Sequence, residues 1–497
     1  MEKKYILALD QGTTGSRAFI FDEKGRVVSS AYQEFKQYYP HPGWVEHDAQ
    51  EIWASCRSVL RQSIQKSKIN PANIVGLGIT NQRETAVLWD RTTTRPLAKA
   101  IVWQCRRTAP ICENLKDQGL EKIVKQKTGL VIDPYFSATK IKWSMDYLRG
   151  IKQKMTQGKV CFGNIDSWLI WNLTKGQAHV TDMTNASRTL LFNIHQYRWD
   201  SDLLKIFGVP EKILPEVKKS GGLFGTVQDG TLGVKIGTPI LSVLGDQQAA
   251  LYGQGCFKAG SIKNTYGTGC FLVLNTGKKP VRSKNGLLTT IVSDLHGNPM
   301  YALEGAVFIS GAVMQWLRDE IKILPSARDS EKIAMSLHEN EGVYFVPAFT
   351  GLGAPYWDPH ARGMIYGLTR GTQRQHIIRA ALESVAYQTK DVFDLMQKES
   401  GTKVNMLKVD GGAVTNNFLM QFQSDILRKQ IVRPKMIDTT VQGAAHLAGV
   451  KAGLWSSRRE LDLLRKVDRS FSPQLTPSLA KKYYQGWLQA VKKVKTK

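Results

Sequence analysis

The first eighty residues alternate between short apolar runs and polar turns. Residues 5–9, 16–22 and 26–35 form three such runs in close succession, which predicts three consecutive β-strands. Within residues 42–67, Asp48 can cap a helix whose apolar side chains recur three or four apart and form one buried face. That face comprises Ile52, Cys56, Val59, Leu60 and Ile64.

A β-branched run at residues 74–80 completes this block as a buried strand, and a similar order of patterns returns after Gly260. The expected strands of the second block lie on both sides of a Gly–Thr turn within 261–277, at 286–294 and at 403–412, and the expected helices span 304–321, 376–400 and 416–427. In the second helix the predicted buried stripe is Ile378, Ala381, Leu382, Val385, Thr389, Val392, Phe393 and Met396.

The repeated order predicts the fold class. Three strands, a helix, a strand and a helix, occurring twice, are typical of an α/β fold with duplicated sheets. A chain of 497 residues is also longer than one ordinary core supports. We therefore expect two related domains, residues 1–253 and 254–497, that face each other across a cleft.

The composition indicates the class of protein and the cellular compartment. With 42% hydrophobic and 22% charged residues the chain is typical of a globular protein, and no apolar run approaches the roughly 20 residues that cross a bilayer. The N-terminus turns polar after one short apolar run, so we expect no signal peptide. Six scattered cysteines without metal-ligand spacing predict free thiols in a reduced, cytoplasmic protein.

The net charge of +26 is the unusual feature of the composition. It is compatible with a nucleic-acid partner, a membrane surface or attraction of an anionic substrate. The basic residues are spread along the whole chain, and their richest stretch, 451–497, lacks the interleaved aromatics and glycines of an RNA-binding strand. A diffuse basic background is therefore favoured over a nucleic-acid partner, and the sequence gives no other reason for the charge.

Four turns combine glycine with an acid or threonine at the end of a strand-like run. Such turns expose backbone N–H groups to an anion, and threonine adds uncharged donors. None is a Walker loop or a dinucleotide-binding glycine fingerprint. The turns are LDQGTTGSR (9–17), VLGDQQAAL (243–251), NTYGTGCF (264–271) and KVDGGAVTNN (408–417).

These turns resemble the two phosphate motifs and the adenosine motif of the actin-like ATPase superfamily. The stretches between them resemble the FGGY family of carbohydrate kinases, in particular its members that phosphorylate glycerol, from Tyr5 to about Gly449. The resemblance implies two duplicated ribonuclease H-like domains with a nucleotide and substrate cleft between them. It rests on GITNQRETAVLWD, AIVWQCRRT, TGLVIDPYFSATKIKW, HVTDMTNASRTLLFNI and VPAFTGLGAPYWDPHARGMIYGLTRGT.

The activity that the resemblance implies is transfer of the γ-phosphoryl group of ATP to glycerol, which gives sn-glycerol 3-phosphate and ADP. Asp246 matches the family's general base, placed to take the proton of the attacking hydroxyl. Asp10 matches the acid associated with Mg²⁺, and Asp246 is also expected near the metal. From the residues alone, Asp246 could instead cap the helix that follows it, and both roles can hold together.

The same resemblance implies the nucleotide-binding residues. One departure lies in the first turn, where many relatives carry serine and this chain has Gly15; the backbone N–H remains, so we expect little effect. The helix around Glu383 is expected to be structural. The residues matched to ATP binding are Thr13, Thr14, Gly15, Arg17, Gly267, Thr268, Gly311, Gln315, Gly412 and Asn416.

For the polyol, the resemblance implies a small polar and aromatic set. Arg83 and Glu84 match a donor and an acceptor for adjacent hydroxyls, although an exposed Arg–Glu couple on a loop is the alternative. Aromatic residues in this set, taken one by one, are more often core than ligand contacts. The set is Arg83, Glu84, Trp103, Tyr135, Asp246, Gln247 and Phe271.

Other functions stay open at this point. A kinase for another polyol or a ketose is a close rival, and a nucleotide-dependent switch in the manner of Hsp70 or actin is a distant one. The small-molecule partners are expected to be glycerol and ATP with Mg²⁺, with no nucleic acid and no transmembrane segment, in a homodimer or homotetramer. In the loop 227–237 Lys235 is the only basic residue, which argues against inhibition by fructose 1,6-bisphosphate and against histidine phosphorylation there.

Overall fold

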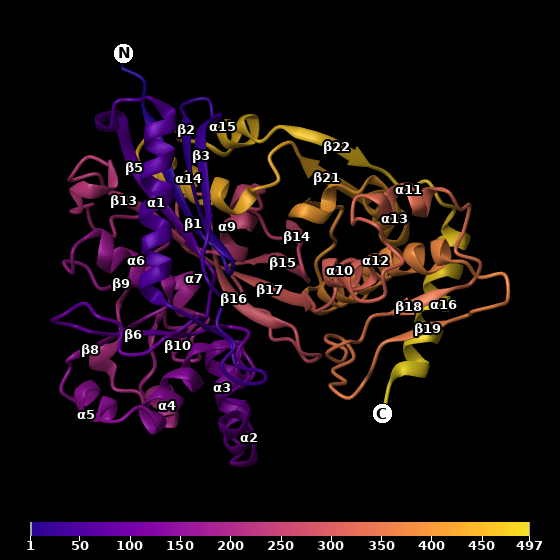
Figure 1. Cartoon of the computed structure of the whole chain (residues 1–497), viewed down its shortest axis with the longest axis horizontal. Helices are drawn as coiled ribbons and strands as arrows, with labels where there is room; N and C mark the ends of the chain where they lie inside the picture. Colours follow the sequence, from indigo (N-terminus) through magenta and orange to yellow (C-terminus); the bar gives the residue numbers. More distant parts are fainter. Residues whose placement is uncertain (1, 497) are drawn as a thin grey trace. The chain divides into compact units, whose positions relative to one another are not determined.

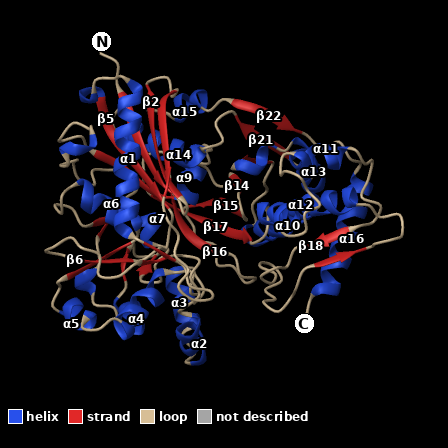
Figure 2. Ribbon diagram, viewed as in Figure 1, coloured by secondary structure: helices blue, strands red, loops and turns tan. Residues whose placement is uncertain are grey.

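Figures 1 and 2 show a computed structural model that describes residues 2–496. The chain forms two compact units, each with its own hydrophobic core. Unit 1 comprises Met1–Phe257, Thr289–Tyr301 and Thr440–Leu464, and unit 2 comprises Lys258–Leu288, Ala302–Thr439 and Arg465–Lys497. Each unit therefore contains segments from distant parts of the sequence.

Unit 1 is built on a five-stranded sheet with the strand order β13-β5-β1-β2-β3. The strands predicted at residues 5–9, 16–22, 26–35 and 74–80 are all present. Strands β1, β2 and β3 pair antiparallel, whereas β5 and β13 run parallel to β1. The bounds are β1 (Tyr5–Gln11), β2 (Gly15–Asp22), β3 (Val27–Glu34), β5 (Ile74–Asn81) and β13 (Ile240–Gly245).

The three parallel strands end in register. Gln11 of β1 lies opposite Asn81 of β5, and Asn81 lies opposite Gly245 of β13. The residues that follow these strands therefore leave the sheet at the same edge, where ligands bind in open α/β sheets. Two of the four glycine turns and the NQRET stretch begin there.

Helices cover this sheet and fix the start of the segment that carries Asp246. Helix α1 (Ala49–Ser67) is capped by Asp48, whose side chain accepts from Gln50 N and Glu51 N, and its five predicted inward residues are all buried. Helix α14 (Thr439–Lys451) approaches closely: a Cβ on Gly443 would lie 1.9 Å from Ala249 O in α9 (Asp246–Gly253). Such proximity holds α9 against the sheet edge.

Smaller elements complete unit 1 (Figure 2). Its short strands are β4 (Glu46–His47), β6 (Val87–Asp90), β7 (Ala100–Ile101), β8 (Val160–Gly163), β9 (Val180–Asp182), β10 (Phe192–Asn193), β11 (Arg198–Trp199) and β12 (Glu216–Lys218). The remaining helices are α2 (Ala109–Asp117), α3 (Glu121–Thr128), α4 (Ser137–Tyr147), α5 (Ile151–Thr156), α6 (Ile165–Leu173), α7 (Met183–Ala186), α8 (Ser201–Phe207) and α15 (Arg458–Leu464).

Unit 2 repeats the topology of unit 1, as the sequence predicts. Its strand order is β16-β17-β15-β14-β20-β21-β22, and the run β17-β15-β14-β20-β21 corresponds to β3-β2-β1-β5-β13. In both sheets the first two strands pair antiparallel and the next two add parallel. The bounds are β14 (Ile262–Tyr266), β15 (Cys270–Gly277), β16 (Leu288–Ser293), β17 (Pro299–Val307), β20 (Met406–Asp410), β21 (Gln430–Pro434) and β22 (Val467–Phe471).

One helix prediction in unit 2 is wrong in its first part. Residues 304–307 continue strand β17, and the helix α10 begins only at Gly311. The apolar run in this stretch fits either element, because strand and helix cannot be separated by periodicity over so few residues. The other elements are α10 (Gly311–Asp319), α11 (Asp329–Met335), β18 (Tyr344–Val346), β19 (Met364–Tyr366), α12 (Arg374–Ser400), α13 (Asn417–Leu427) and α16 (Pro477–Val494).

The core of unit 2 forms around α12. All eight residues of its predicted stripe are buried. The final stretch AVKKVKTK predicts a solvated helix end or tail. In the structure one face of α16 instead packs against this core through residues that include Trp487, Val491 and Val494. Lys492 and Lys493 of the same helix remain exposed.

Asp391 on α12 gives unit 2 a pH-dependent stability. Its carboxylate accepts from Tyr484 Oη and from Trp487 Nε1 (2.9 Å), and burial raises its pKa to about 7. The folded state therefore binds a proton that the unfolded state releases between about pH 4 and 7, so the free energy of unfolding falls as pH rises through this window. We expect Asp391→Asn to remove this loss and to be more stable than wild type at pH 8, by a few kcal/mol at most.

Urea denaturation of wild type and Asp391→Asn at pH 5 and pH 8 measures this difference. Asp391→Asn should exceed wild type in stability by more at pH 8 than at pH 5, where only the first part of the loss has occurred. Equal stability at both pH values would show that the carboxyl does not titrate with folding.

Two further predictions can be compared with the structure. All six cysteines are buried free thiols, as the sequence predicts. Within residues 2–496, no helix combines the length and the apolar character that a bilayer crossing requires.

Candidate active site

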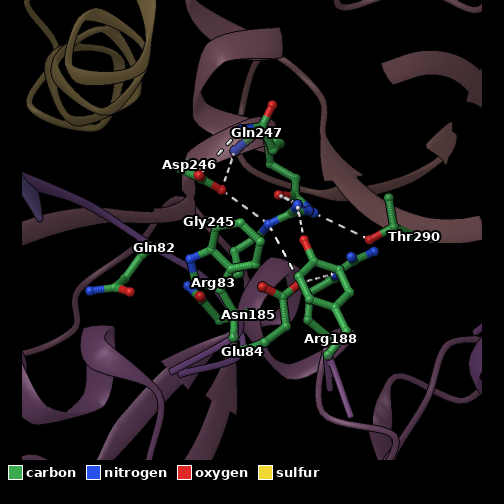
Figure 3. A network of polar contacts seen from close by, with 12 residues as sticks. Gln82, Arg83, Glu84, Asn185, Arg188, Gly245, Asp246, Gln247 and Thr290 are labelled. Carbon is green, nitrogen blue, oxygen red and sulfur yellow. Dashed lines mark hydrogen bonds and ion pairs between the residues drawn. The ribbon is translucent and has the colours of Figure 1, made fainter. Parts of the chain in front are cut away.

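A buried network of charges lies at the sheet edge where β1, β5 and β13 end (Figure 3). Arg83 Nε lies 3.0 Å from Asp246 Oδ1 and 3.7 Å from Glu84 Oε1. Arg188, which follows α7, donates from Nε to the same Glu84 oxygen at 2.6 Å. The side chains of Arg83 and Glu84 are each only 2% exposed, so the exposed Arg–Glu couple is excluded, and the side chain of Asp246 is 32% exposed.

Asp246 is the first residue of α9, and Gly245 is its N-cap. The alternative in which Asp246 is the N-cap is therefore wrong, because Asp246 lies one position inside the helix. The Oδ1 of Asp246 nevertheless accepts from Gln247 N at 2.7 Å. The Gln247 side chain contacts the other oxygen, with Nε2 3.2 Å from Oδ2. The carboxylate is thus held by Arg83 and Gln247 while one third of its side chain stays open to solvent.

The backbone at Glu84 is unusual. Its φ of 62° lies in the left-handed region, which a residue with a side chain rarely adopts, and Thr85 N closes the turn by donating to Arg83 O at 2.7 Å. Such local strain persists only where the surroundings over-determine it, and it gathers at functional sites. Here the strained turn directs Arg83 toward Asp246 and Glu84 toward Arg188.

Gly245 makes room for Arg83. A Cβ on Gly245 would lie 2.7 Å from both Cγ and Cδ of Arg83. Gly245→Ala should therefore displace the guanidinium from Asp246, and a misplacement of about 1 Å at such a site costs on the order of 10²-fold in catalytic efficiency. The measurement is steady-state kinetics with the polyol and the nucleotide that the sequence resemblance implies.

Gly222→Ala provides the matched control, because a Cβ there meets no heavy atom within 4 Å. We expect the control to keep the wild-type KM. If Gly245→Ala also keeps it, Arg83 is not constrained as the contacts indicate.

Two predicted aromatic residues lie beside this network. The rings of Trp103 and Tyr135 meet edge to face with centroids 5.6 Å apart, and Arg83 Nη2 lies 3.4 Å from Tyr135 Oη. Both side chains are half-buried, which fits a pocket wall better than a core position. The fully buried Lys140 fixes this segment by donating from Nζ to Tyr135 O (2.6 Å) and Phe136 O (3.0 Å), and burial lowers its pKa to about 8.

The first glycine turn connects β1 to β2. Asp10 is buried near its start, opposite Arg17 and Thr80 in register. Among residues 2–496 nothing accepts a hydrogen bond from the backbone N–H of Thr13 or Thr14, so both are available to an anion. A Cβ on Gly15 would lie 2.6 Å from the Tyr32 ring and 2.8 Å from Gln33 O, so glycine suits the approach of β3 there.

Unit 2 presents the corresponding turns. The carbonyls of Gly267 and Thr268 accept from Gly311 N and Ser310 N at 2.9 Å, which docks the start of α10 on the turn. Asn416 caps α13 by accepting from Leu419 N, and a Cβ on Gly412 would meet nothing within 4 Å. Of the other predicted residues in this unit, Gln315 is exposed on α10 and Phe271 is half-buried on β15.

Comparison with known proteins identifies the family. Residues 5–253 match the N-terminal domain, and residues 262–452 the C-terminal domain, of the FGGY family of carbohydrate kinases. The chain belongs to this family.

Three relatives of this FGGY kinase are similar over nearly their whole length. The glycerol kinase of Caldanaerobacter subterraneus subsp. tengcongensis is 56% identical over 490 residues, which cover 99% of this chain and 98% of that protein. Glycerol kinase 2 of Thermotoga maritima is 54% identical over 488 residues, 98% of each chain. The crystal structure of Plasmodium falciparum glycerol kinase with ADP has a TM-score of 0.94 at 38% identity, covering 99% of this chain and 98% of that one, so the fold is that of the actin-like ATPases.

Sequence reasoning about the FGGY kinase misses several residues of the network. Arg188 is fully buried against Glu84, and Gln248 accepts from Arg83 Nη1 at 3.3 Å while its Nε2 reaches Thr290 Oγ1 at 3.2 Å. The sequence indicates Arg188 only weakly, as a single basic residue directly before an apolar run in SRTLLF. Gln248 has no such signal, because the sequence does not show which of the two adjacent glutamines, Gln247 or Gln248, joins the network.

Proposed function

We propose that this FGGY kinase transfers the γ-phosphoryl group of ATP to glycerol and releases sn-glycerol 3-phosphate and ADP. The observation that carries the proposal is the placement of Arg83, Glu84 and Asp246 at one sheet edge, with Trp103 and Tyr135 beside them. This set offers a few donors and acceptors and a short apolar wall, which suits a three-carbon polyol. The full-length likeness to glycerol kinases agrees with it.

In the proposed reaction Asp246 takes the proton of the attacking hydroxyl. Its carboxylate is oriented from two sides by Arg83 and Gln247, and its exposed third can face the substrate. Arg83 and Glu84 hydrogen-bond the polyol, and Arg188 balances the charge of Glu84 when water leaves. A larger sugar would leave these buried groups unpaired, which is the strongest source of discrimination available to such a site.

Mg²⁺ is part of the proposal. Its preferred ligands are hard oxygens with several waters retained, and Asp10, at the start of the phosphate turn, is the carboxylate that fits. The ion would neutralise phosphate charge during transfer. Asp246 fits less well as a ligand, because Arg83 and Gln247 already occupy its two oxygens.

The nucleotide-binding residues also remain a proposal. The free N–H groups of Thr13 and Thr14 and the exposed Thr268 suit phosphate oxygens, and Arg17 adds charge. We assign Gly311, Gln315, Gly412 and Asn416 of unit 2 to the adenosine side.

Compartment, assembly and regulation are further proposals. Free buried thiols support a reducing, cytoplasmic location, and we expect a homodimer or homotetramer. In the loop 227–237 an arginine comes from elsewhere in the chain, since Arg57 of α1 donates to Thr231 Oγ1 at 3.1 Å. Fructose 1,6-bisphosphate titration of the kinase assay tests whether this loop responds.

A competition experiment tests the proposed function. The purified protein is incubated with Mg-ATP and an equimolar mixture of glycerol, erythritol, xylulose and gluconate, and phosphorylated products are identified by mass spectrometry. Glycerol phosphate should dominate. A dominant sugar or sugar-acid phosphate would instead support the rival FGGY kinase, and ATP loss without any organic phosphate would support a nucleotide switch.

A further inference from the structure

Six residues of unit 1 form a closed ring of hydrogen bonds that begins and ends at Thr13 of the phosphate turn. On one side Gln37 Nε2 donates to Thr13 O at 3.1 Å, and Gln37 Oε1 lies 2.5 Å from His47 Nε2. His47 is fully buried on β4. Its other nitrogen, Nδ1, lies 3.4 Å from Gln82 Nε2 at the end of β5.

The other half of the ring returns through the predicted polyol pocket. Thr85 Oγ1 donates to Gln82 Oε1 at 2.9 Å and accepts from Trp103 N at 3.3 Å. Trp103 then donates from Nε1 to Thr13 Oγ1 at 3.0 Å. One aromatic side chain thus borders the polyol site with its ring and holds the phosphate turn with its N–H.

The chemistry of the partners fixes the direction of every bond in the ring. Thr13 O can only accept, so the amide N of Gln37 faces it and Oε1 faces His47. His47 Nε2 therefore carries the proton, and Nδ1 is an acceptor that shares the amide group of Gln82 with Gln11 Oε1 (3.0 Å) and Gly12 O (3.3 Å). The neutral imidazole that this requires agrees with burial, which lowers the pKa of His47 to about 4.

The direction of these hydrogen bonds determines the role that is left to the hydroxyl of Thr13. An indole N–H is a donor only, so Thr13 Oγ1 accepts from Trp103 and keeps its own proton for another partner. No atom of residues 2–496 accepts that proton. The ring therefore presents the Thr13 hydroxyl as an oriented donor, which is the form that a phosphate oxygen requires.

We infer that His47 is a positioning residue that joins the phosphate turn to the polyol pocket, so that Trp103 and Thr13 are held in their working orientation together. His47 itself is fully buried, so it acts on the two sites only through its hydrogen-bond partners. This inference rests on the proposed function for the identity of the second ligand only. The effect of His47 on nucleotide binding can be measured without glycerol.

The test compares two substitutions at His47. His47→Leu removes both ring bonds and should lower kcat for glycerol phosphorylation at least 10-fold and weaken ADP binding, measured by calorimetry without glycerol, about 5–10-fold. His47→Gln can still donate to Gln37 and should recover most of both losses. A proton-nitrogen NMR spectrum should show a protected His47 Nε2–H in wild type.

His179→Leu is the matched control for a merely structural loss. His179 is also a buried histidine, bonded to Phe162 O at 2.8 Å and packed on Trp89 and Trp171 outside the ring, and burial lowers its pKa to about 4. It should lose stability without a change in kcat. If His47→Leu fails to fold, Gln37→Met breaks the same ring at a half-buried position and should show the same losses.

The inference is overturned if folded His47→Leu, or folded Gln37→Met, keeps wild-type kcat and ADP affinity, or if His179→Leu loses as much of both. Failure of the proposed function would look different. In that case wild type would not phosphorylate glycerol, while the ADP affinities of the His47 variants would still be compared.

Discussion

Asp246→Asn should lower kcat for glycerol phosphorylation by about 10²–10⁴-fold and leave ATP affinity nearly unchanged, because asparagine cannot accept the hydroxyl proton. The substitution is nearly isosteric. The amide oxygen can still accept from Gln247 N at the start of α9, so the fold should be kept. Steady-state kinetics with glycerol, together with calorimetric ATP binding, measures both effects.

A matched control for this substitution is Asp229→Asn. Asp229 Oδ1 also accepts a backbone N–H in the first turn of a short helix, from Thr231 at 3.0 Å, but it lies on the loop 227–237. It should keep wild-type turnover. Retention of full turnover in Asp246→Asn would refute the general-base assignment.

Glu84→Gln should carry the second large effect, on stability and on glycerol binding together. Glu84 Oε1 lies 2.6 Å from Arg188 Nε and 3.7 Å from Arg83 Nε, and all three side chains are at most 2% exposed. Loss of the carboxylate charge leaves two buried guanidinium groups with less compensation. Breaking a buried charge pair in this way costs on the order of 3–5 kcal/mol. Urea denaturation gives the stability, and a glycerol titration should show a raised KM.

Glu383→Gln is the control for Glu84→Gln, since Glu383 is a buried glutamate paired with a single arginine. Arg379 Nε donates to it at 2.8 Å, and burial raises the pKa of Glu383 to about 7. Its carboxyl already takes up a proton near neutral pH, so glutamine should cost less stability there at pH 6 and leave the glycerol KM unchanged. Equal losses at the two positions would show that Glu84 has only a generic structural role.

Much of the fold follows from the sequence because period-2 and period-3.6 patterns report burial directly. The stripes of α1 and α12 and the cap at Asp48 are examples in which local chemistry and tertiary packing agree. The hydrophobic pattern gives a wrong prediction at residues 304–307, where local chemistry and tertiary packing do not agree, because a short apolar run suits both a strand and a helix. The burial of one face of the C-terminal helix α16 was not predicted, for a related reason. Lysines dominate the composition of this helix, yet Trp487 and Val491 on one face are buried.

The candidate site could be predicted only in part. Family resemblance supplied Arg83, Glu84 and Asp246, and the register of β1, β5 and β13 explains why they meet. Arg188 and His47 could not be found in this way, because Arg188 pairs with Glu84, 104 residues away in sequence, and His47 connects Gln37 to Gln82, which is 35 residues away from it. Contacts of this kind are set by the tertiary fold and leave no local pattern.

The most direct test of glycerol phosphorylation is ³¹P NMR of the purified chain with Mg-ATP and glycerol. We predict that the γ-phosphate resonance of ATP disappears with stoichiometric appearance of glycerol 3-phosphate and ADP, and that little inorganic phosphate forms. An unchanged ATP spectrum, or conversion to ADP and inorganic phosphate without glycerol 3-phosphate, would contradict the proposed function.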